Sequence, residues 1–455
     1  MRSRTWALRS SSPVSSSSQS FSPGRSPVKT MGTSSPGIRP GADVPVGCYL
    51  SGGLDSSLTA ALGRRVKGES FRTFSVRFED AEYDETPYQR AVARRIGSDH
   101  RELLVGRRDI AEAFPAVVAD AERPLLRAAP APLFLLSRLV RDAGIKVVLT
   151  GEGADEMFGG YDLFREGKVR RFWGRRPASA CRPRLLERLY PWLARSPVAQ
   201  QGLAREFFGR GRERWAEPGF AHQPRWRAAA ALQRLFLPEV RAEAARTDVV
   251  ARLLGSLPGP FRRWSFLAQD QYLEVRTLLS GYLLSSQGDR MLMAHSVEGR
   301  FPFLDADLVE IANALPASAK LHGLDEKQVL KRAARGLVPP EVLERPKQPY
   351  RAPDALSFVG PDAPAWVAEI LSAGALAEAG VFDAPAVDRL RKKCQASGGE
   401  PLSNADNMAL VGVLSTGLLH AQAVRAPPGR AGPPAFRTVV DRLSGPAAGP
   451  PPGPR

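Results

Sequence analysis

The chain has 455 residues, 43% of them hydrophobic and 24% charged, and is long and apolar enough to bury a large core. Its three cysteines, Cys48, Cys181 and Cys394, exclude a disulfide framework and have no metal-binding spacing. No apolar run approaches the length of a membrane span, and the N-terminus lacks the apolar stretch of a secretory signal. We therefore expect a cytoplasmic protein with no membrane partner.

The net charge of +17 would suit a nucleic-acid-binding protein, but its distribution argues against one. Residues 1–40 hold six basic side chains and no acidic one, and residues 426–455 hold four basic and one acidic. Over residues 165–227 the arginines alternate with Trp and Leu, which is typical of amphipathic helices with a solvated face. We expect no nucleic-acid partner, and moderate basicity also suits a protein whose ligands are anions.

The two ends are of low complexity. Residues 1–40 are rich in Ser, Pro and Gly, and residues 426–455 are rich in Pro and Gly. Neither segment can bury enough apolar area to offset the entropy of ordering it, so both are predicted to be disordered. Residues 41–425 are predicted to form one domain.

Within this domain strands and helices alternate at first. Apolar runs predict strands over residues 46–50, 71–78, 100–105 and 145–150. Helical patterns predict helices from Ser56 toward Arg64, from an Asp84 cap to Ile96, and over 111–119 and 133–141. This alternation indicates an α/β fold with a parallel sheet, flanking helices and a ligand at the carboxyl ends of the strands. After Tyr161 the strand signals stop, and a mostly helical C-terminal part is predicted.

The segment Ser51-Gly-Gly-Leu-Asp-Ser56 connects the first strand to the first helix. Free backbone N–H groups and the helix dipole make such a turn a phosphate site, and Gly52 and Gly53 let the backbone approach closely. No Lys follows the glycines, so the turn is not a Walker A loop. Asp55 beside a phosphate requires a cation between them, for which Mg²⁺ is the natural candidate. The alternative is an ordinary strand–turn–helix connection.

A second glycine-rich turn, 151–161, follows the last predicted strand and brings three carboxylates, Glu152, Asp155 and Glu156, within five residues. Carboxylates packed this closely need cations or protons to coexist. A solvated acidic face is the alternative. Because a parallel sheet would place this turn beside the first, we favour Asp55 and Asp155 sharing Mg²⁺ that bridges ATP phosphates.

Two later clusters are consistent with a phosphate site. Residues 287–305 mix charged with apolar side chains, which suggests ion pairs in a half-buried setting. Residues 325–331 begin a helix and supply Lys327, and Arg345 and Lys347 follow. Basic side chains that reach a phosphate cleft can neutralise charge on a leaving group. Surface ion pairs are the alternative for each cluster.

These motifs together resemble the synthetase domain of glutamine-hydrolysing asparagine synthetase. The resemblance rests on Ser51-Gly-Gly-Leu-Asp-Ser56, Gly151-Glu-Gly-Ala-Asp-Glu-Met-Phe-Gly-Gly-Tyr161 and Ser296-Val-Glu-Gly-Arg-Phe-Pro-Phe-Leu-Asp305, and extends over residues 43–424 in the family's order. The segments at Glu326-Lys327, Arg345-Pro-Lys-Gln-Pro-Tyr-Arg351 and 403–410 are also similar to the bacterial branch. The first motif alone marks only the wider ATP-pyrophosphatase superfamily. The resemblance implies an adenine nucleotide alpha hydrolase-like fold with a PP-loop.

The family's functional residues can be carried over by position. The ATP-binding residues would be Leu50, Ser51, Gly52, Gly53, Asp55, Ser56, Val76, Thr150 and Gly151, those of the first turn on the pyrophosphate and the others on the nucleoside. The catalytic residues would be Glu152 in forming or using the acyl-adenylate, Lys327 in stabilising adenylation, and Arg127 in handling aspartate and phosphate. Asp55 and Asp155 would bind Mg²⁺.

The resemblance also implies a reaction, that of an amide-forming ligase using ATP, aspartate and ammonia. The aspartate side-chain carboxylate would attack the α-phosphorus of ATP and release pyrophosphate. Ammonia would then attack the carbonyl of β-aspartyl-AMP, and AMP would leave.

One departure from the family concerns the source of ammonia. Where the family carries a nucleophilic cysteine directly after the initiator Met, this chain has Arg2. We therefore expect that the chain cannot hydrolyse glutamine. It would use free ammonia or a separate glutaminase subunit, or the gene model is truncated. A homodimer also stays open.

Three alternatives to asparagine synthesis remain. A relative that closes a β-lactam or a peptide macrolactam would keep the nucleotide motifs and change the acceptor pocket. A non-catalytic remnant would serve as a binding subunit, although Asp55, Glu152, Asp155 and Lys327 are all present. An enzyme of tRNA modification would use the same phosphate loop, but it usually needs paired cysteines for sulfur transfer, which this chain lacks.

Overall fold

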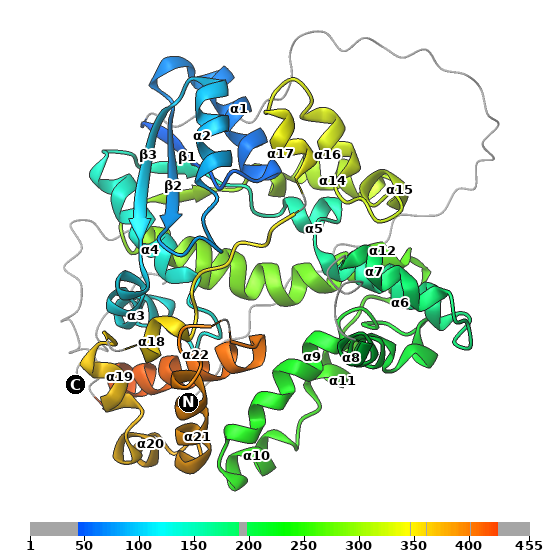
Figure 1. Cartoon of the computed structure of the whole chain (residues 1–455). Helices are drawn as coiled ribbons and strands as arrows, with labels where there is room; N and C mark the ends of the chain where they lie inside the picture. The colour runs from blue at the N-terminus through cyan, green and yellow to red at the C-terminus, as the bar shows by residue number, and fades with distance from the viewer. Residues whose placement is uncertain (1–43, 191–197, 346, 361, 401, 426–455) are drawn as a thin grey trace, which may run out of the picture. The chain divides into compact units, whose positions relative to one another are not determined.

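Figure 1 shows the computed structural model of the chain, which describes residues 44–190, 198–345, 347–360, 362–400 and 402–425. The two ends predicted to be disordered lie outside these ranges, and their disorder stays a prediction. The described residues form a parallel sheet flanked by helices and a long helical part, as the sequence predicts.

The sheet has five parallel strands in the order β3-β2-β1-β4-β5. The strands are β1 (Val46–Tyr49), β2 (Arg72–Phe78), β3 (Asp99–Val105), β4 (Val147–Leu149) and β5 (Glu298–Arg300). Cys48 of β1 pairs with Thr73 of β2 on one side and with Leu149 of β4 on the other. Because β1 and β4 are parallel neighbours, the loops that leave their carboxyl ends lie side by side.

The four predicted strands are confirmed, but the prediction that strands end before Tyr161 is wrong. The fifth strand, β5, is the three residues Glu298–Arg300, and it pairs with β4 at the edge of the sheet. Two of its three residues are charged and Glu298 is exposed, so no apolar run marks it. Its strand conformation comes from backbone pairing with β4, which a local pattern does not reveal.

Four helices accompany the first four strands: α1 (Leu54–Lys67), α2 (Thr86–Ile96), α3 (Arg107–Ala121) and α4 (Pro130–Asp142). In Figure 1, α1 and α2 are drawn in blue beside the strands that they contact. The predicted Asp84 cap is wrong, because Glu85 precedes α2 without a side-chain bond to it. Asp84 instead accepts a hydrogen bond from the hydroxyl of Thr86.

Helices dominate the remainder of the described chain. Its helices are α5 (Ala154–Phe158), α6 (Asp162–Gly174), α7 (Leu185–Leu189), α8 (Val198–Gly209), α9 (Gln223–Ala230), α10 (Pro238–Ala244), α11 (Val249–Gly255), α12 (Phe266–Glu274), the π-helix η7 (Val275–Asp289), α13 (Arg290–Met293), α14 (Ala306–Ala314), α15 (Ala317–Lys320), α16 (Gln328–Ala333), α17 (Pro340–Glu344), α18 (Leu356–Val359), α19 (Ala365–Ile370), α20 (Ala373–Ala379), α21 (Ala384–Gln395), α22 (Asn404–Leu419) and the π-helix η9 (His420–Arg425). Short 3₁₀ turns connect several of them.

Both faces of the sheet are buried, because alternate residues of a strand point to opposite sides. In β4, Val147 and Leu149 join one apolar cluster with α1, α2, α14, α16 and α17, whereas Val148 joins the other. The second cluster is larger, and α3, α4, α13 and α18–α22 contribute to it. The sheet is therefore the middle layer of an α/β fold, and ligands can reach it only at the ends of its strands.

One helix of the described chain, formed by α22 and η9 over Asn404–Arg425, is long and apolar enough to span a membrane by length and composition. Leu410, Val413 and Leu414 of this helix are buried in the larger cluster, where α22 packs on α3 and α21. Core helices meet the same criteria of length and composition, and the packing of α22 identifies it as one of them.

Candidate active site

The first turn runs from the end of β1 into α1 and is held by its own serines. The hydroxyls of Ser51 and Ser56 lie 2.9 Å apart, and Ser56 Oγ accepts a 3.1 Å hydrogen bond from the Ser51 N–H. Gly52 has φ +78°, and a Cβ there would stand 2.8 Å from the Tyr88 Cβ. Gly53 precedes α1 without a side-chain cap. The turn is thus preformed, and the N–H groups at the start of α1 are free for an anion.

The second turn runs from β4 into α5 and touches the first. A Cβ on Gly151 would approach the Ser56 N–H nitrogen to 3.0 Å and the Asp55 Cβ to 3.1 Å, so only glycine allows this contact. Gly153, with φ +90°, begins α5 and directs Asp155 back toward Asp55. The two glycine-rich turns therefore form one continuous surface at the carboxyl ends of β1 and β4.

Two carboxylates and two ammonium groups meet at this surface, and we call Asp55, Asp155, Lys327 and Lys347 the ionic cluster. Lys327 Nζ lies 2.5 Å from Asp55 Oδ2 and 2.6 Å from Asp155 Oδ1. Lys347 Nζ lies 2.8 Å from Asp155 Oδ2 and 3.9 Å from Asp55 Oδ2. Burial would raise the pKa of Asp155, but the two lysines outweigh it and lower the pKa to about 2. Burial opposes the charge of Lys347, yet Asp155 and Asp55 raise its pKa above the usual value.

Lys327, a member of the ionic cluster, has a strained left-handed backbone conformation, and Gly160 beside it leaves room for its side chain. Lys327 has φ 54° and ψ 31°, and it is one of three non-glycine residues with positive φ in the described ranges. A Cβ on Gly160 would stand 2.1 Å from both Asp155 Oδ1 and Lys327 Cε. Strained non-glycine residues of this kind gather at functional sites, because the surrounding structure must hold them in place.

Glu152 lies beside the cluster in a less polar setting. Burial raises its pKa, and the Thr150 side chain lowers the pKa less than burial raises it. Its Oε2 atom and Asp55 Oδ1 are buried without a hydrogen-bond partner among the described residues. These two carboxylate oxygens are therefore available to a ligand or a cation. Glu156 of the same turn does not join the cluster, because its carboxylate accepts a 2.8 Å hydrogen bond from Tyr161.

Comparison with known proteins shows the family of this chain. The family model for asparagine synthase matches residues 38–422. The chain belongs to the asparagine synthase family. It is 34% identical, over 69% of its length and 45% of the relative's, to a putative glutamine-hydrolysing asparagine synthetase of Mycobacterium tuberculosis (strain ATCC 25618 / H37Rv).

Two further relatives differ in the names they carry. Asparagine synthetase [glutamine-hydrolyzing] 1 of Bacillus subtilis (strain 168) is 28% identical over 69% of this chain and 47% of its own length. The protein called Amidase chry2 of Gibberella zeae is 29% identical over 70% of this chain and 50% of its own. The chain thus spans about half the length of these curated relatives.

Of the residues expected near the nucleoside, Leu50 and Thr150 directly follow β1 and β4 in this asparagine synthase domain, whereas Val76 lies within β2. Leu50 and Val76 are buried, and their carbonyls accept hydrogen bonds from Ser75 Oγ and, at 3.0 Å, from Gln89 Nε2. The Thr150 N–H donates to the Arg300 carbonyl at 3.0 Å, which ties the second turn to β5. Leu50 and Thr150 thus border the joined turns through bonds that hold the sheet.

Arg127 is placed differently from the other predicted residues. Its Nη1 atom lies 3.0 Å from Asp354 Oδ2 and 3.4 Å from Asn404 Oδ1. Within the described ranges, its bonds and ion pairs do not reach the ionic cluster. The structure therefore brings the two turns, Lys327 and Glu152 together and leaves Arg127 paired elsewhere.

Arg345 and Lys347 were predicted only as basic side chains that could reach a phosphate cleft, and Gly160 was recognised only as part of a motif. The sequence did not identify their partners. Arg345 bonds the Gly52 carbonyl at 3.3 Å, pairs with Glu85 and lies 4.1 Å over the ring of Tyr88. Because these partners are far away in the sequence, no local pattern could have linked Arg345 to the first turn.

The donors fit Mg²⁺ only together with a nucleotide. No group of three or more His, Cys, Asp or Glu residues with a metal-binding arrangement occurs in the described ranges. Asp55 and Asp155 nevertheless approach one shared cation, which in the structure is the Lys327 ammonium. Mg²⁺ needs only one or two carboxylates when phosphates and waters complete its octahedron. The unpaired Asp55 Oδ1 is a suitable donor of this kind.

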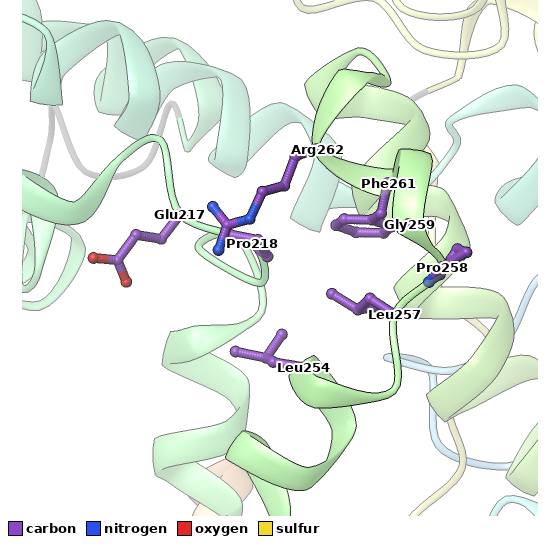
Figure 2. Close-up of a pocket in the computed structure, with 8 residues that line it drawn as sticks. All are labelled: Glu217, Pro218, Leu254, Leu257, Pro258, Gly259, Phe261 and Arg262. Carbon is purple, nitrogen blue, oxygen red and sulfur yellow. The ribbon is translucent and has the colours of Figure 1, made fainter.

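A separate cavity lies in the helical part (Figure 2). Its volume is about 500 Å³, and it is lined by Glu217, Pro218, Leu254, Leu257, Pro258, Gly259, Phe261 and Arg262. None of these residues is a predicted site residue or a member of the ionic cluster, so this cavity is distinct from the candidate active site.

Proposed function

We propose that this chain is an AMP-forming amide synthetase that uses ATP to make asparagine from aspartate and ammonia. The observation that carries the proposal is the ionic cluster at the joined turns, where two carboxylates and two lysines surround a phosphate-binding helix start. A carboxylate oxygen of the acid forms a bond to the α-phosphorus of ATP. The bond between the α-phosphorus and the oxygen that bridges it to the β-phosphorus breaks, and pyrophosphate leaves.

The first turn supplies the phosphate contacts. The N–H groups at the start of α1 and the hydroxyls of Ser51 and Ser56 would hold the pyrophosphate portion of ATP. Mg²⁺ bound by Asp55 and Asp155 would neutralise phosphate charge. Lys327 and Lys347 would then leave the two carboxylates and bind the phosphate oxygens, where they stabilise the charge that builds up on the leaving pyrophosphate.

Glu152 is suited to the second half of the reaction. When ammonia attacks the acyl-adenylate, a carbon–nitrogen bond forms, the bond to AMP breaks, and the nitrogen must lose a proton. Glu152 has an unpaired carboxylate oxygen and a raised pKa, so its ionised form is a stronger base than an exposed glutamate. It can accept that proton.

The proposal assigns the ammonia supply to a source outside the described residues. Burial raises the pKa of the Cys48 thiol well above the usual range and that of Cys394 to about 11, which makes both poor nucleophiles. Ammonia would come from solution, from a separate glutaminase subunit, or from a part of the protein outside this sequence. Cytoplasmic location is part of the same proposal, and a homodimer is an open alternative to a monomer.

A second candidate function is amide or lactam formation on another carboxylic acid in secondary metabolism. It would use the same adenylation chemistry, and the fungal relative named as an amidase is compatible with it. A non-catalytic remnant is disfavoured, since Lys327 keeps a strained backbone and a buried position between two carboxylates.

The test is an assay with ATP, Mg²⁺, aspartate and ammonium, which we expect to yield AMP, pyrophosphate and asparagine. The Lys327→Ala variant should lower the rate by about 100- to 1,000-fold, because the lysine stabilises transition-state charge. Lys331→Ala is the matched control, since Lys331 on α16 pairs with Asp325 and Glu326 outside the cluster. ADP as the product, or equal rates for the two variants, would contradict the proposal.

A further inference from the structure

The Lys327 ammonium lies between Asp55 and Asp155, in the position that a shared divalent cation would take. Its Nζ atom is 2.5 Å from Asp55 Oδ2 and 2.6 Å from Asp155 Oδ1. Only the first contact has the geometry of a hydrogen bond, and Asp155 Oδ1 and Asp55 Oδ1 are buried without one among the described residues. An ammonium must aim an N–H at each oxygen, whereas a divalent cation coordinates the surrounding oxygens directly. The ammonium therefore satisfies the two carboxylates only in part.

The ammonium and a divalent cation exclude each other from this position. Lys327 is only 2% exposed, and a Cβ on Gly160 would stand 2.1 Å from both Lys327 Cε and Asp155 Oδ1, so there is no free space beside the contact. Two cations held by the same pair of carboxylates would also repel each other strongly in this buried setting. One of them can bridge Asp55 and Asp155 only after the other has left.

The charge balance of the ionic cluster decides what can displace the lysine. Two carboxylates are matched by two ammonium groups, so the cluster is neutral. A divalent cation entering alone would add unmatched positive charge or separate Lys327 from both of its carboxylate partners. A polyphosphate entering alone would attract the lysines and leave Asp55 and Asp155 unpaired beside its own negative charge. Together the two ligands supply opposite charges, so each removes the obstacle to the other.

Lys327 can leave the carboxylates without a change in the fold. Its carbonyl accepts the first hydrogen bond of α16 from the Lys331 N–H at 2.9 Å, which anchors its backbone at φ 54°. The ammonium, by contrast, is carried on a flexible four-carbon stem. Rotation about the bonds of this stem is sufficient to move the charge from Asp55, at the start of α1, to phosphate oxygens at the adjoining first turn.

We propose that Lys327 is a built-in substitute for the metal ion, which holds Asp55 and Asp155 together until a divalent cation and a polyphosphate arrive as a pair. The inference rests on the proposed adenylating function and adds the regulation of its metal position. Lys327 excludes a free divalent cation, gives way to the metal–nucleotide pair, and reaches the phosphates by the same rotation. Metal and nucleotide are therefore bound cooperatively, and neither binds tightly alone.

The first experiment measures uptake of Mn²⁺, which prefers the same oxygen ligands as Mg²⁺, from the loss of the free-ion paramagnetic resonance signal. Without nucleotide, Lys327→Met should bind Mn²⁺ about 10- to 100-fold more tightly than the wild type, because the competing ammonium is gone. Lys331→Met, which loses a lysine paired with Asp325 and Glu326, should bind as the wild type does. Adding Asp55→Asn to Lys327→Met should remove the gain. Equal uptake by Lys327→Met and the wild type, or a gain that survives Asp55→Asn, would overturn the inference.

The second experiment uses only the wild type, so it does not depend on the folding of a variant. The protein is titrated with Mn²⁺ alone and after saturation with α,β-methylene ATP, an analogue that cannot release pyrophosphate. After correction for the Mn²⁺ that the analogue binds in solution, Mn²⁺ should bind at least about 10-fold more tightly to the nucleotide-loaded protein. By reciprocity, Mn²⁺ should strengthen binding of the analogue by the same factor. Equal affinity for Mn²⁺ with and without the analogue would overturn the inference.

These outcomes are distinct from those that test the proposed function. A wild type that forms AMP and pyrophosphate, yet binds Mn²⁺ equally with and without the analogue, would overturn the inference and keep the adenylating function. Failure of the analogue to bind in the presence of Mn²⁺, together with no AMP in the assay with aspartate and ammonium, would refute the proposed function and the inference with it.

Discussion

Gly160 controls, at the scale of single residues, whether the ionic cluster can form. Its missing side chain leaves room for both Asp155 and Lys327, since a Cβ would stand 2.1 Å from an atom of each. Neither neighbour can retreat easily, because Lys327 is already held at positive φ and is paired with two carboxylates. A methyl group at residue 160 would therefore displace the charged side chains of Asp155 and Lys327 more than it would disturb the hydrophobic core.

We predict that Gly160→Ala lowers the rate of ATP-dependent amide formation by about 100-fold or more, because misplacing charged groups by about 1 Å has effects of this size. The cost to the free energy of unfolding should be only about 1–3 kcal/mol, typical of overpacking. Steady-state assays and chemical denaturation measure the two effects. Gly374→Ala on α20, where a Cβ meets nothing within 4 Å, is the control and should leave activity unchanged. Equal activity of the two variants would contradict the role of Gly160.

At the scale of elements, the short helix α5 depends on two neighbours to hold Asp155. Gln271 of α12 donates from Nε2 to the carbonyls of Glu156 and, at 2.8 Å, of Met157. Lys320 at the end of α15 donates to Gln271 Oε1 at 3.2 Å. These bonds satisfy carbonyls that a five-residue helix leaves free. The bond to Gln271 requires a buried lysine, whose charged form is disfavoured there: burial lowers the pKa of Lys320 to about 8.

We predict that Lys320→Met is more stable than the wild type at pH 7, by about 2 kcal/mol. The charged form of Lys320 is disfavoured in the folded state, whose pKa of about 8 lies below the unfolded value of about 10.4. The wild type should therefore regain stability as the pH rises from about 8 to 10, and the difference between the two proteins should vanish there. Urea denaturation at several pH values measures this, with the exposed Lys392→Met as control. A difference that is constant with pH would show that charge burial is not the cause.

At the scale of the whole molecule, the segment around residues 345–354 connects the C-terminal half to both turns. Arg345 contacts the first turn at Gly52, Lys347 pairs with Asp155 in the second, and Asp354 pairs with Arg127. The sequence separations are large, for example 192 residues between Lys347 and Asp155. Formation of the site thus requires residues that are distant in the sequence to meet.

We predict that Lys347→Met abolishes measurable amide synthesis and lowers the free energy of unfolding by about 2 kcal/mol, because Asp155 loses one of its two cations in a buried setting. Mg²⁺ should recover part of this stability by pairing with the Asp155 carboxylate that has lost Lys347. Thermal denaturation with and without Mg²⁺ tests both effects. Lys331→Met is the control, and a loss of stability in it equal to that of Lys347→Met would contradict the argument.

The sequence predicted the two glycine-rich turns, four of the five strands and their parallel arrangement. These features follow from local chemistry, since apolar runs form buried strands and glycines are required where the backbone must turn sharply or approach another chain. The family motifs led equally to Asp55, Asp155 and Lys327 as members of one site. β5 escaped prediction because its two charged residues owe their conformation to pairing with β4.

Other features depend on tertiary contacts that no local pattern encodes. Lys347 and Arg345 join the site only when the chain folds back over the first turn, and Arg127 is drawn to Asp354 instead. The sequence by itself therefore determined the two glycine-rich turns and the phosphate site predicted from them, because a turn and its helix are local. The tertiary structure decided which cations meet Asp55 and Asp155 and where Arg127 is paired, because charge pairing depends on which distant residues meet.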